Sequence, residues 1–375
     1  MRDRKIVLLL IAALAAFALI AAGCGSDDAA DGDDTETADD TTAADDEATT
    51  DTTADAGSDD ETTTETSEAE GGDSESTGPL RVAIVAPSAS NDLAFTQSMV
   101  DAVNVIGETR EIEVEITDGT FVVEDAAAAI RGYAEEDFDI VIAHGSQYGA
   151  PLAEIAPDFP EISFAWGTAV DTFGLDNVFA YTVQADQGGY IMGTMAAELS
   201  ESGVLGVVGP VEVGDAALYV NGFEAGAKAQ SPDVEVNINY IDSFSDVGLA
   251  AEAAEAHLTA GADVMTGSAQ MVVGATGVAR EADVAWFGTQ ANQTSLGESN
   301  VVASQVYHWE VVLDEMLDAR EGGTLGGETY TLTFANDGLV IEYNDGYDLP
   351  AEVKTLAEDT TAAISDGSLT TGVSG

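Results

Sequence analysis

The chain has 375 residues, and its 70 aspartates and glutamates against 10 lysines and arginines give a formal net charge of −60. Affinity for nucleic acids depends on lysines and arginines that neutralise phosphates, so this composition excludes a DNA- or RNA-binding role. The single cysteine leaves no intrachain disulfide and no zinc site built from cysteines. The length favours two domains over one.

The first 23 residues have the pattern of an export signal. A short basic start over residues 2–5 is followed by an apolar run over 6–20. A secretory signal carries about 7–15 apolar residues, whereas a helix that spans a membrane needs about 20. The run ends in Leu-Ile-Ala-Ala-Gly, directly before Cys24. We therefore expect 1–23 to be a signal peptide.

The junction at Cys24 resembles the lipobox of bacterial lipoproteins, in which the cysteine is diacylated and becomes the mature N-terminus. This resemblance implies lipidation at Cys24, the lipid bilayer as a partner, and a location on the extracytoplasmic face of the cell membrane. Two or three acyl chains exceed the marginal membrane affinity of one chain, so the anchor is expected to be stable. The alternative is an ordinary signal peptide, or an uncleaved anchor, with an incidental cysteine.

Residues 25–78 hold 21 acidic residues, no basic one, and no aromatic residue, valine, isoleucine or leucine. A segment with so little apolar surface and so much like charge cannot offset the entropy lost on ordering. We expect 24–78 to be a disordered acidic tether, extended by self-repulsion, that holds a folded domain away from the membrane. Cation binding by the aspartates is the alternative, although no D-x-D-x-D-G loop with a closing glutamate occurs.

From Leu80 onward, short β-branched runs alternate with amphipathic helical runs. This alternation is typical of βαβ units and parallel sheets. Because some 300 residues exceed one doubly wound sheet, we expect an α/β fold of two Rossmann-like lobes. The expected strands are 81–86, 112–116, 139–143, 162–165, 178–183, 204–208, 234–240, 263–266 and 284–287. The expected helices are 92–107, 123–134, 151–156, 189–199, 215–229, 248–260 and 272–282.

Ligands of such sheets bind beyond the carboxyl ends of the strands. Six segments that follow expected strands are rich in hydroxyls, amides, glycines and aromatic rings, and poor in charge. Such groups suit a small, roughly neutral ligand with a flat face. Helix caps and turns use the same residue types, which is the alternative for any one segment. The segments are 87–92, 144–148, 166–168, 242–244, 267–270 and 288–292.

The chain resembles the basic membrane protein family, which are substrate-binding lipoproteins of ABC importers. Asp92, Phe95 and Gln97 match the opening of that family, and Thr96 stands where asparagine is usual. The similarity runs from about residue 80 to 345 and rests on many weak motifs in order. Further matching segments are 156–160, 189–196, 221–227, 243–246 and 260–264.

The resemblance implies a type I periplasmic-binding-protein fold, with two hinged lobes and the ligand in the cleft, and ABC permease and ATPase subunits as partners. Within a binding domain over 79–375, the expected first lobe is 79–185 with 292–325, and the second is 186–291 with 326–375. The family resemblance and the segments that follow the expected strands together predict twelve ligand-binding residues. They are Asn91, Asp92, Phe95, Thr96, Ser146, Gln147, Trp166, Asn221, Phe244, Gln290, Asn292 and Trp309.

Several members of that family bind purine nucleosides, with the base between aromatic rings and the ribose hydroxyls on acidic residues. Where nucleoside binders commonly have Gly-Val-Asp-Ser-Asp-Gln, this chain has Gly-Thr-Gln-Ala-Asn-Gln at 288–293. Gln290 and Asn292 thus replace both carboxylates, and an amide accepts hydroxyl protons less well than a carboxylate. The replacement favours a free purine base slightly over a nucleoside, and both remain open.

An enzyme is the main rival class, but its motifs are missing from the sequence. The glycines around Ser146 are misplaced for a nucleophile elbow, no P-loop lysine occurs, and the three histidines are far apart in the chain. We therefore expect no catalysis, no cofactor and no metal site. A ligand-sensing lipoprotein without transport, or an importer component for a non-purine solute, remains the alternative function.

Overall fold

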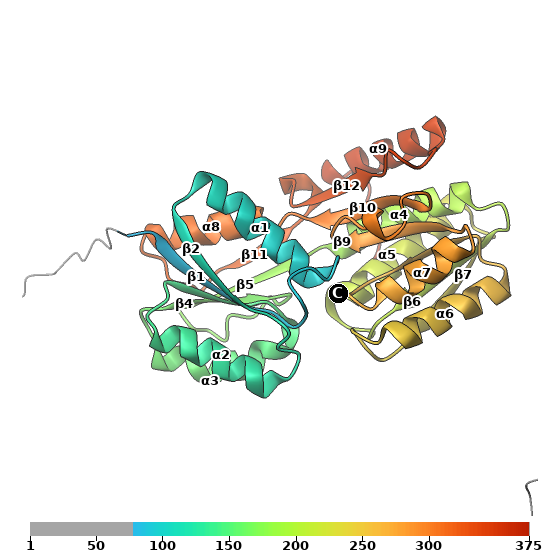
Figure 1. The fold of residues 1–375 in the computed structure, drawn as a ribbon. Helices are drawn as coiled ribbons and strands as arrows, with labels where there is room; N and C mark the ends of the chain where they lie inside the picture. The colour runs from blue at the N-terminus through green and yellow to red at the C-terminus, as the bar shows by residue number, and fades with distance from the viewer. Residues whose placement is uncertain (1–77, 375) are drawn as a thin grey trace, which may run out of the picture. The chain divides into compact units, whose positions relative to one another are not determined.

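Two six-stranded sheets organise residues 78–374, the part of the chain that the computed structural model describes (Figure 1). The expected signal peptide, Cys24 and the acidic tether lie outside these residues. Each strand and helix expected above is present, and the α/β class is confirmed. No helix within 78–374 has the length and apolar character needed to cross a membrane.

The first sheet is parallel throughout, with the strand order β11-β5-β4-β3-β1-β2. Successive residues of a strand point to opposite faces, and both faces of the interior strand β1 are apolar. Val82 and Ile84 belong to the core shared with α1 and α8, and Ala83 and Val85 to the core shared with α2 and α3. The strands are β1 (Leu80–Val85), β2 (Ile112–Thr117), β3 (Ile140–Ala143), β4 (Ser163–Gly167), β5 (Val178–Val183) and β11 (Thr329–Leu332). The helices are α1 (Phe95–Thr109), α2 (Val123–Glu135), α3 (Gly149–Ile155) and α8 (Glu310–Glu321).

The second sheet has the order β12-β10-β9-β8-β6-β7 and is parallel except for the antiparallel pair β10–β12. Helices α4, α5 and α9 share a core with one face, and α6 and α7 share a core with the other. The strands are β6 (Val204–Gly209), β7 (Glu235–Tyr240), β8 (Val264–Gly267), β9 (Ala285–Gln290), β10 (Val301–Tyr307) and β12 (Leu339–Tyr343). The helices are α4 (Ala185–Leu199), α5 (Gly214–Gln230), α6 (Val247–Ala260), α7 (Val272–Glu281) and α9 (Ala351–Ser365); 3₁₀ turns lie at Ser146–Tyr148, Ala156–Asp158, Thr294–Leu296 and Phe334–Asn336.

The chain passes between the two sheets three times, after β5, after β10 and after β11. These crossings differ from the expected lobe boundaries. Strand β10, expected in the first lobe, pairs with β9 in the second sheet, and β11, expected in the second lobe, pairs with β5 in the first. The pairing of a short strand depends on distant partners, which its own residues do not encode.

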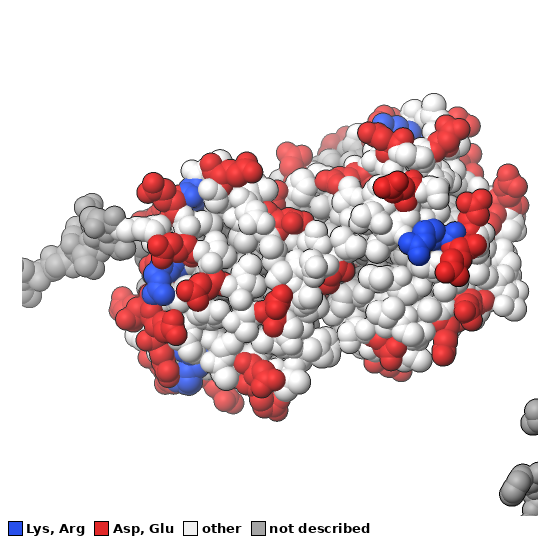
Figure 2. All heavy atoms as spheres, in the orientation of Figure 1, with Lys and Arg blue, Asp and Glu red and all other residues white. Residues whose placement is uncertain are grey.

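On the face shown in Figure 2, acidic side chains are spread over both lobes, and few basic ones lie among them. From residue 79 to the end, 48 acidic residues stand against seven basic ones. The folded part is therefore itself strongly acidic.

Candidate ligand-binding site

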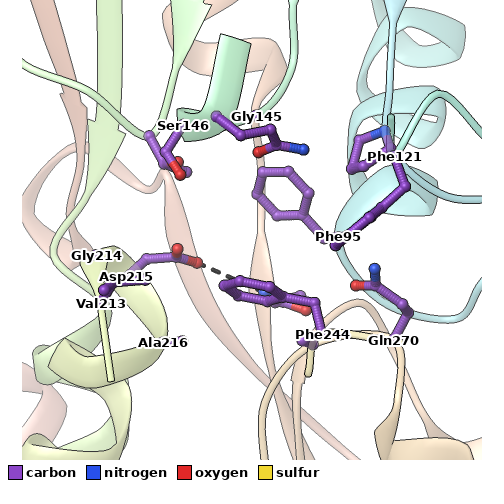
Figure 3. Close-up of a pocket in the computed structure, with 15 residues that line it drawn as sticks. Phe95, Phe121, Gly145, Ser146, Val213, Gly214, Asp215, Ala216, Phe244 and Gln270 are labelled. Carbon is purple, nitrogen blue, oxygen red and sulfur yellow. Dashed lines mark hydrogen bonds between the residues drawn. The ribbon is translucent and has the colours of Figure 1, made fainter. Parts of the chain in front are cut away.

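A cavity that is open to solvent lies where strand ends of the two sheets face each other (Figure 3). Its walls come from the carboxyl ends of strands and from the segments between these strands and the next helices, as expected for parallel α/β sheets. The first lobe contributes residues after β1, β2, β3 and β4, and the second contributes residues after β6, β7, β8 and β9. The lining residues are Pro87, Phe95, Phe121, Gly145, Ser146, Gln147, Thr168, Val213, Gly214, Asp215, Ala216, Phe244, Ala269, Gln270 and Gln290.

Three phenylalanine rings give the cavity flat apolar walls. Phe95 opens helix α1, Phe121 follows β2, and Phe244 follows β7. The rings of Phe121 and Phe244 come from different lobes, with centroids 6.5 Å apart and planes 52° apart. Figure 3 shows Phe95 and Phe244 on either side of the space into which the Asp215 carboxylate points. Such walls suit a planar ligand that can stack.

A buried imidazole supports the Phe95 ring from behind. His144 stacks on Phe95 with ring centroids 3.9 Å apart and planes within 8° of each other. Its Nε2 lies 3.1 Å from the Phe95 carbonyl oxygen, which can only accept, so Nε2 carries the proton. Its Nδ1 then accepts from the Tyr181 hydroxyl at 2.8 Å. Burial lowers the pKa of His144 to about 3, so the ring is neutral at physiological pH.

A carboxylate and an amide form the polar end of the cavity. Asp215 lies in the first turn of α5, where the helix dipole favours negative charge. Its Oδ2 accepts from the Gln290 amide at 3.5 Å and from the Tyr307 hydroxyl at 3.4 Å, both long for hydrogen bonds. Burial raises the pKa of Asp215, and these contacts lower it less. The Gln290 side chain is 3% exposed, and its Oε1 has no hydrogen-bond partner.

Three lining residues have a left-handed backbone conformation, which residues other than glycine rarely adopt. Thr168, Ala269 and Gln290 have φ values of 52°, 70° and 75°. Each such residue costs on the order of 1 kcal/mol or more and persists where the surrounding structure holds it. Gln290 is the last residue of β9, and Thr168 and Ala269 lie one and two residues beyond β4 and β8, so all three occupy the strand ends that border the cavity.

Five of the expected ligand-binding residues line the cavity: Phe95, Ser146, Gln147, Phe244 and Gln290. The structure places the other seven outside its lining, and in most of them the local hydrogen bonds show why.

Near the start of α1, the Asp92 carboxylate is already hydrogen-bonded to neighbouring residues of the chain. It accepts from the backbone amides of Ala94, Thr96 and Gln97 and from the Ser88 hydroxyl, and so holds the helix N-terminus. The Thr96 side chain is fully buried and lies 2.7 Å from the Ser88 hydroxyl. Asn91 in the same turn is exposed.

The two expected tryptophans support the cavity from a second layer. Trp309 is fully buried, donates to Ser98 Oγ at 2.9 Å, and packs edge-on against Phe95 and His144. Trp166 stacks on Phe173 and donates to the Gly145 carbonyl at 3.2 Å. Both tryptophans therefore position residues that line the cavity.

Two expected amides point elsewhere. Asn292 is exposed and donates to Glu342 at 2.6 Å, so it does not reach the cavity. Asn221 lies on α5 and lines a wider hollow that adjoins the cavity, shares Thr168 and 213–215 with it, and is also bordered by residues near the C-terminus.

Phe121 and Asp215 were missed by the sequence analysis. They follow β2 and β6, two strand ends that were absent from the six segments considered. The same positional rule, applied to every strand, would have included both. Among the residues that the structure describes, no group of three or more histidines, cysteines, aspartates and glutamates could hold a metal ion.

The comparisons with known proteins agree with this geometry. Residues 80–366 match the Bmp family, described as PnrA-like ABC transporter substrate-binding proteins. A purine-binding protein of Brucella abortus is 26% identical over 294 residues, which are 77% of this chain and 82% of that protein. The transcriptional activator protein Med of Bacillus subtilis is 26% identical over 253 residues, or 67% of this chain and 78% of that one.

The fold has a close counterpart among solved structures. An ABC transporter solute-binding protein from Conexibacter woesei superposes with a TM-score of 0.66 at 23% identity, over 78% of this chain and 98% of that one. Its fold confirms the expected periplasmic-binding-protein architecture. Because the family match covers well over half of the sequence, the chain belongs to the PnrA-like family of ABC transporter substrate-binding proteins.

Proposed function

We propose that the chain is the solute-binding component of an ABC importer and that it captures a purine base or nucleoside in the cavity between its lobes. The observation that carries this proposal is a cavity with three phenylalanine rings along its walls and a carboxylate and amides at its end. Stacking of a base on an aromatic ring contributes about 1–3 kcal/mol, and the amides can pair with the base edge. The relative from Brucella abortus is named a purine-binding protein, which agrees with this ligand class.

Calorimetry with adenine, guanine, adenosine and guanosine tests the proposal. We expect at least one of them to bind wild type, and Phe244→Ala to weaken that binding about five- to a hundredfold because one stacking surface is lost. Phe159→Ala is the matched control, since Phe159 packs against the first-lobe core beside Arg131 and does not line the cavity. If none of the four binds below about millimolar concentration, the purine assignment is wrong, and the ligand is another solute.

We further propose that Cys24 is lipidated and anchors the protein on the extracytoplasmic face of the membrane, with the acidic segment 24–78 as its tether. The lipobox-like residues before the only cysteine support this. Cys24→Ser should move the protein from the membrane fraction to the soluble fraction. Retention of this variant in membranes after alkaline washing would mean that the apolar run itself is the anchor.

A ligand sensor is the second candidate function. It is favoured by the Bacillus subtilis relative, which is named a transcriptional activator. Deletion of the gene separates the two functions. Loss of an importer component abolishes uptake of a labelled purine, whereas loss of a sensor leaves uptake intact and changes gene expression. Neighbouring genes for an ATPase and permeases would also favour the importer.

A further inference from the structure

We propose that Asp215 and Gln290 together recognise a ligand edge that carries two neighbouring hydrogen-bond donors, and that this pair of side chains sets the ligand preference of the site. The inference rests on the proposed function and names what the cavity selects within the purine class.

The first step is the placement of two acceptors side by side. Asp215 from α5 and Gln290 from the end of β9 both line the cavity, and their side chains are 3.5 Å apart. Gln290 uses its amide nitrogen on Asp215, which leaves its Oε1 free of any hydrogen bond although the side chain is 97% buried. A buried acceptor without a partner costs on the order of 1–3 kcal/mol, so it is a place where a bound donor gains the most.

The second step concerns charge. The fifteen residues that line the cavity include no lysine, arginine or histidine. The Asp215 carboxylate therefore meets no cation in the lining, and its two side-chain contacts, with Gln290 and Tyr307, are long. Burial of a charged group with weak partners lowers stability, unless a ligand completes its hydrogen bonds.

The third step concerns the ligand. A carboxylate beside an amide oxygen pairs with two donors set close together, and it disfavours a ligand that presents acceptors there. In the purine class, two groups have this chemistry. One is the edge of a 2-aminopurine, with its ring N–H and amino group, and the other is the vicinal diol of ribose. Either group would explain why the carboxylate of Asp215, from α5, lies beside the amide at position 290.

Two pairs of compounds distinguish the base edge from the ribose diol as the group that supplies the two donors. Guanine and hypoxanthine differ in the 2-amino group, and guanosine and 2′,3′-dideoxyguanosine differ in the diol. We expect wild type to prefer the donor-bearing member of one pair by at least tenfold in Kd, and Asp215→Asn to reduce that preference to less than threefold. The pair that shows the effect identifies the donor group.

The matched control is Glu212→Gln, which removes the same charge from an exposed residue of the loop before α5 that does not line the cavity. It should leave both preferences unchanged, whereas equal effects of the two variants would indicate a long-range charge effect and overturn the proposal. A purely structural role for Asp215 predicts a lower melting temperature in Asp215→Asn. We expect an equal or higher one, because a half-buried charge is replaced by a neutral side chain of the same shape.

Binding with no preference in either pair, or a preference that Asp215→Asn retains in full, overturns the inference and leaves the purine proposal standing. Absence of binding by these four compounds and also by adenine and adenosine overturns the purine proposal instead. The inference is then decided by mass spectrometry of the small molecule released from purified wild type and from Asp215→Asn. Two neighbouring donors on a molecule held only by wild type support it, and any other result contradicts it.

Discussion

At the residue scale, the candidate site depends on side chains that never touch its cavity. Phe95 is held by His144 on its face and by the edge of Trp309, and Tyr181 fixes His144 in turn. His144 and Trp309 are fully buried, and their polar atoms are paired within this group and with Ser98. Locked partners of this kind hold a binding ring in one orientation, which reduces the entropy lost when a ligand binds.

The pH dependence of stability should report the buried His144. Its pKa is lowered to about 3 in the folded state, whereas an unfolded histidine titrates near 6.5. The unfolded state therefore binds a proton first, and stability is lost as the pH falls below about 6.5. Between pH 7 and pH 5 this one residue should remove about 2 kcal/mol from the free energy of unfolding.

Urea unfolding at pH 7 and pH 5 checks this, with wild type compared to His144→Gln. The variant should be less stable at both pH values but should lose less stability on acidification. His257, whose pKa burial also lowers, contributes in the same direction in both proteins and cancels in the comparison. An equal loss on acidification in the two proteins would mean that His144 does not titrate as the structure implies.

The distinction between the lining and its support could not be read from the sequence. Asp92, Trp166 and Trp309 all stand near strand ends or helix starts, where the positional rule expects ligand contacts. In the structure the Asp92 carboxylate accepts hydrogen bonds from three backbone amides. Trp166 lies behind Gly145, and Trp309 lies behind Phe95. Position along the chain predicts the neighbourhood of the site, but side-chain packing decides which residue reaches the ligand.

At the element scale, helices α4 and α5 pack unusually closely because glycines line their interface. A Cβ atom added to Gly193 would lie 2.0 Å from the Phe223 carbonyl oxygen, and one added to Gly226 would lie 2.0 Å from the Tyr190 carbonyl oxygen. Gly189 and Gly222 are similarly confined by backbone of the other helix. Each helix thus carries a pair of glycines four residues apart, which lets the two backbones approach each other.

We predict that Gly193→Ala lowers the free energy of unfolding by about 1–3 kcal/mol, because the added methyl group must push the two helices apart. The matched control is Gly277→Ala in helix α7, where an added Cβ meets no atom within 4 Å. There the better helix propensity of alanine should raise stability by up to about 1 kcal/mol. Urea unfolding measures both, and a neutral Gly193→Ala would show that the interface is less tight than described.

The strands and helices themselves could be predicted because each is encoded locally. A β-branched run such as Arg81–Val85 reads as a buried strand, and the spacing of apolar residues in 95–106 reads as a helix that packs on one face. The exchange of β10 and β11 between the sheets could not be predicted in this way. Strand β11 has four residues, and its place is set by its pairing with β5, far earlier in the chain.

At the scale of the whole molecule, electrostatic repulsion dominates over attraction. The folded part has seven basic residues against 48 acidic ones, so attractive pairs are limited by the number of bases. Arg110 alone is shared among Asp314, Asp318 and Glu321. The acidic side chains that remain are distributed over the visible face in Figure 2. Ion pairs near the surface contribute little to the stability of a protein, so the screening of these pairs by salt should cost little.

Salt should therefore stabilise this protein. The distance over which charges interact falls from about 10 Å at 0.1 M ionic strength to about 3 Å at 1 M, which removes most of the repulsion between surface carboxylates. Since a large net charge destabilises the compact state, we expect the melting temperature to rise by several degrees over this range. Thermal unfolding followed by circular dichroism measures this rise in melting temperature.

Sodium chloride and sodium sulfate at equal ionic strength serve as the control, because sulfate also stabilises proteins by exclusion from their surface. Equal gains in both salts would support screening. A gain in sulfate alone, or a fall in sodium chloride, would show that the ion pairs or other terms outweigh the repulsion.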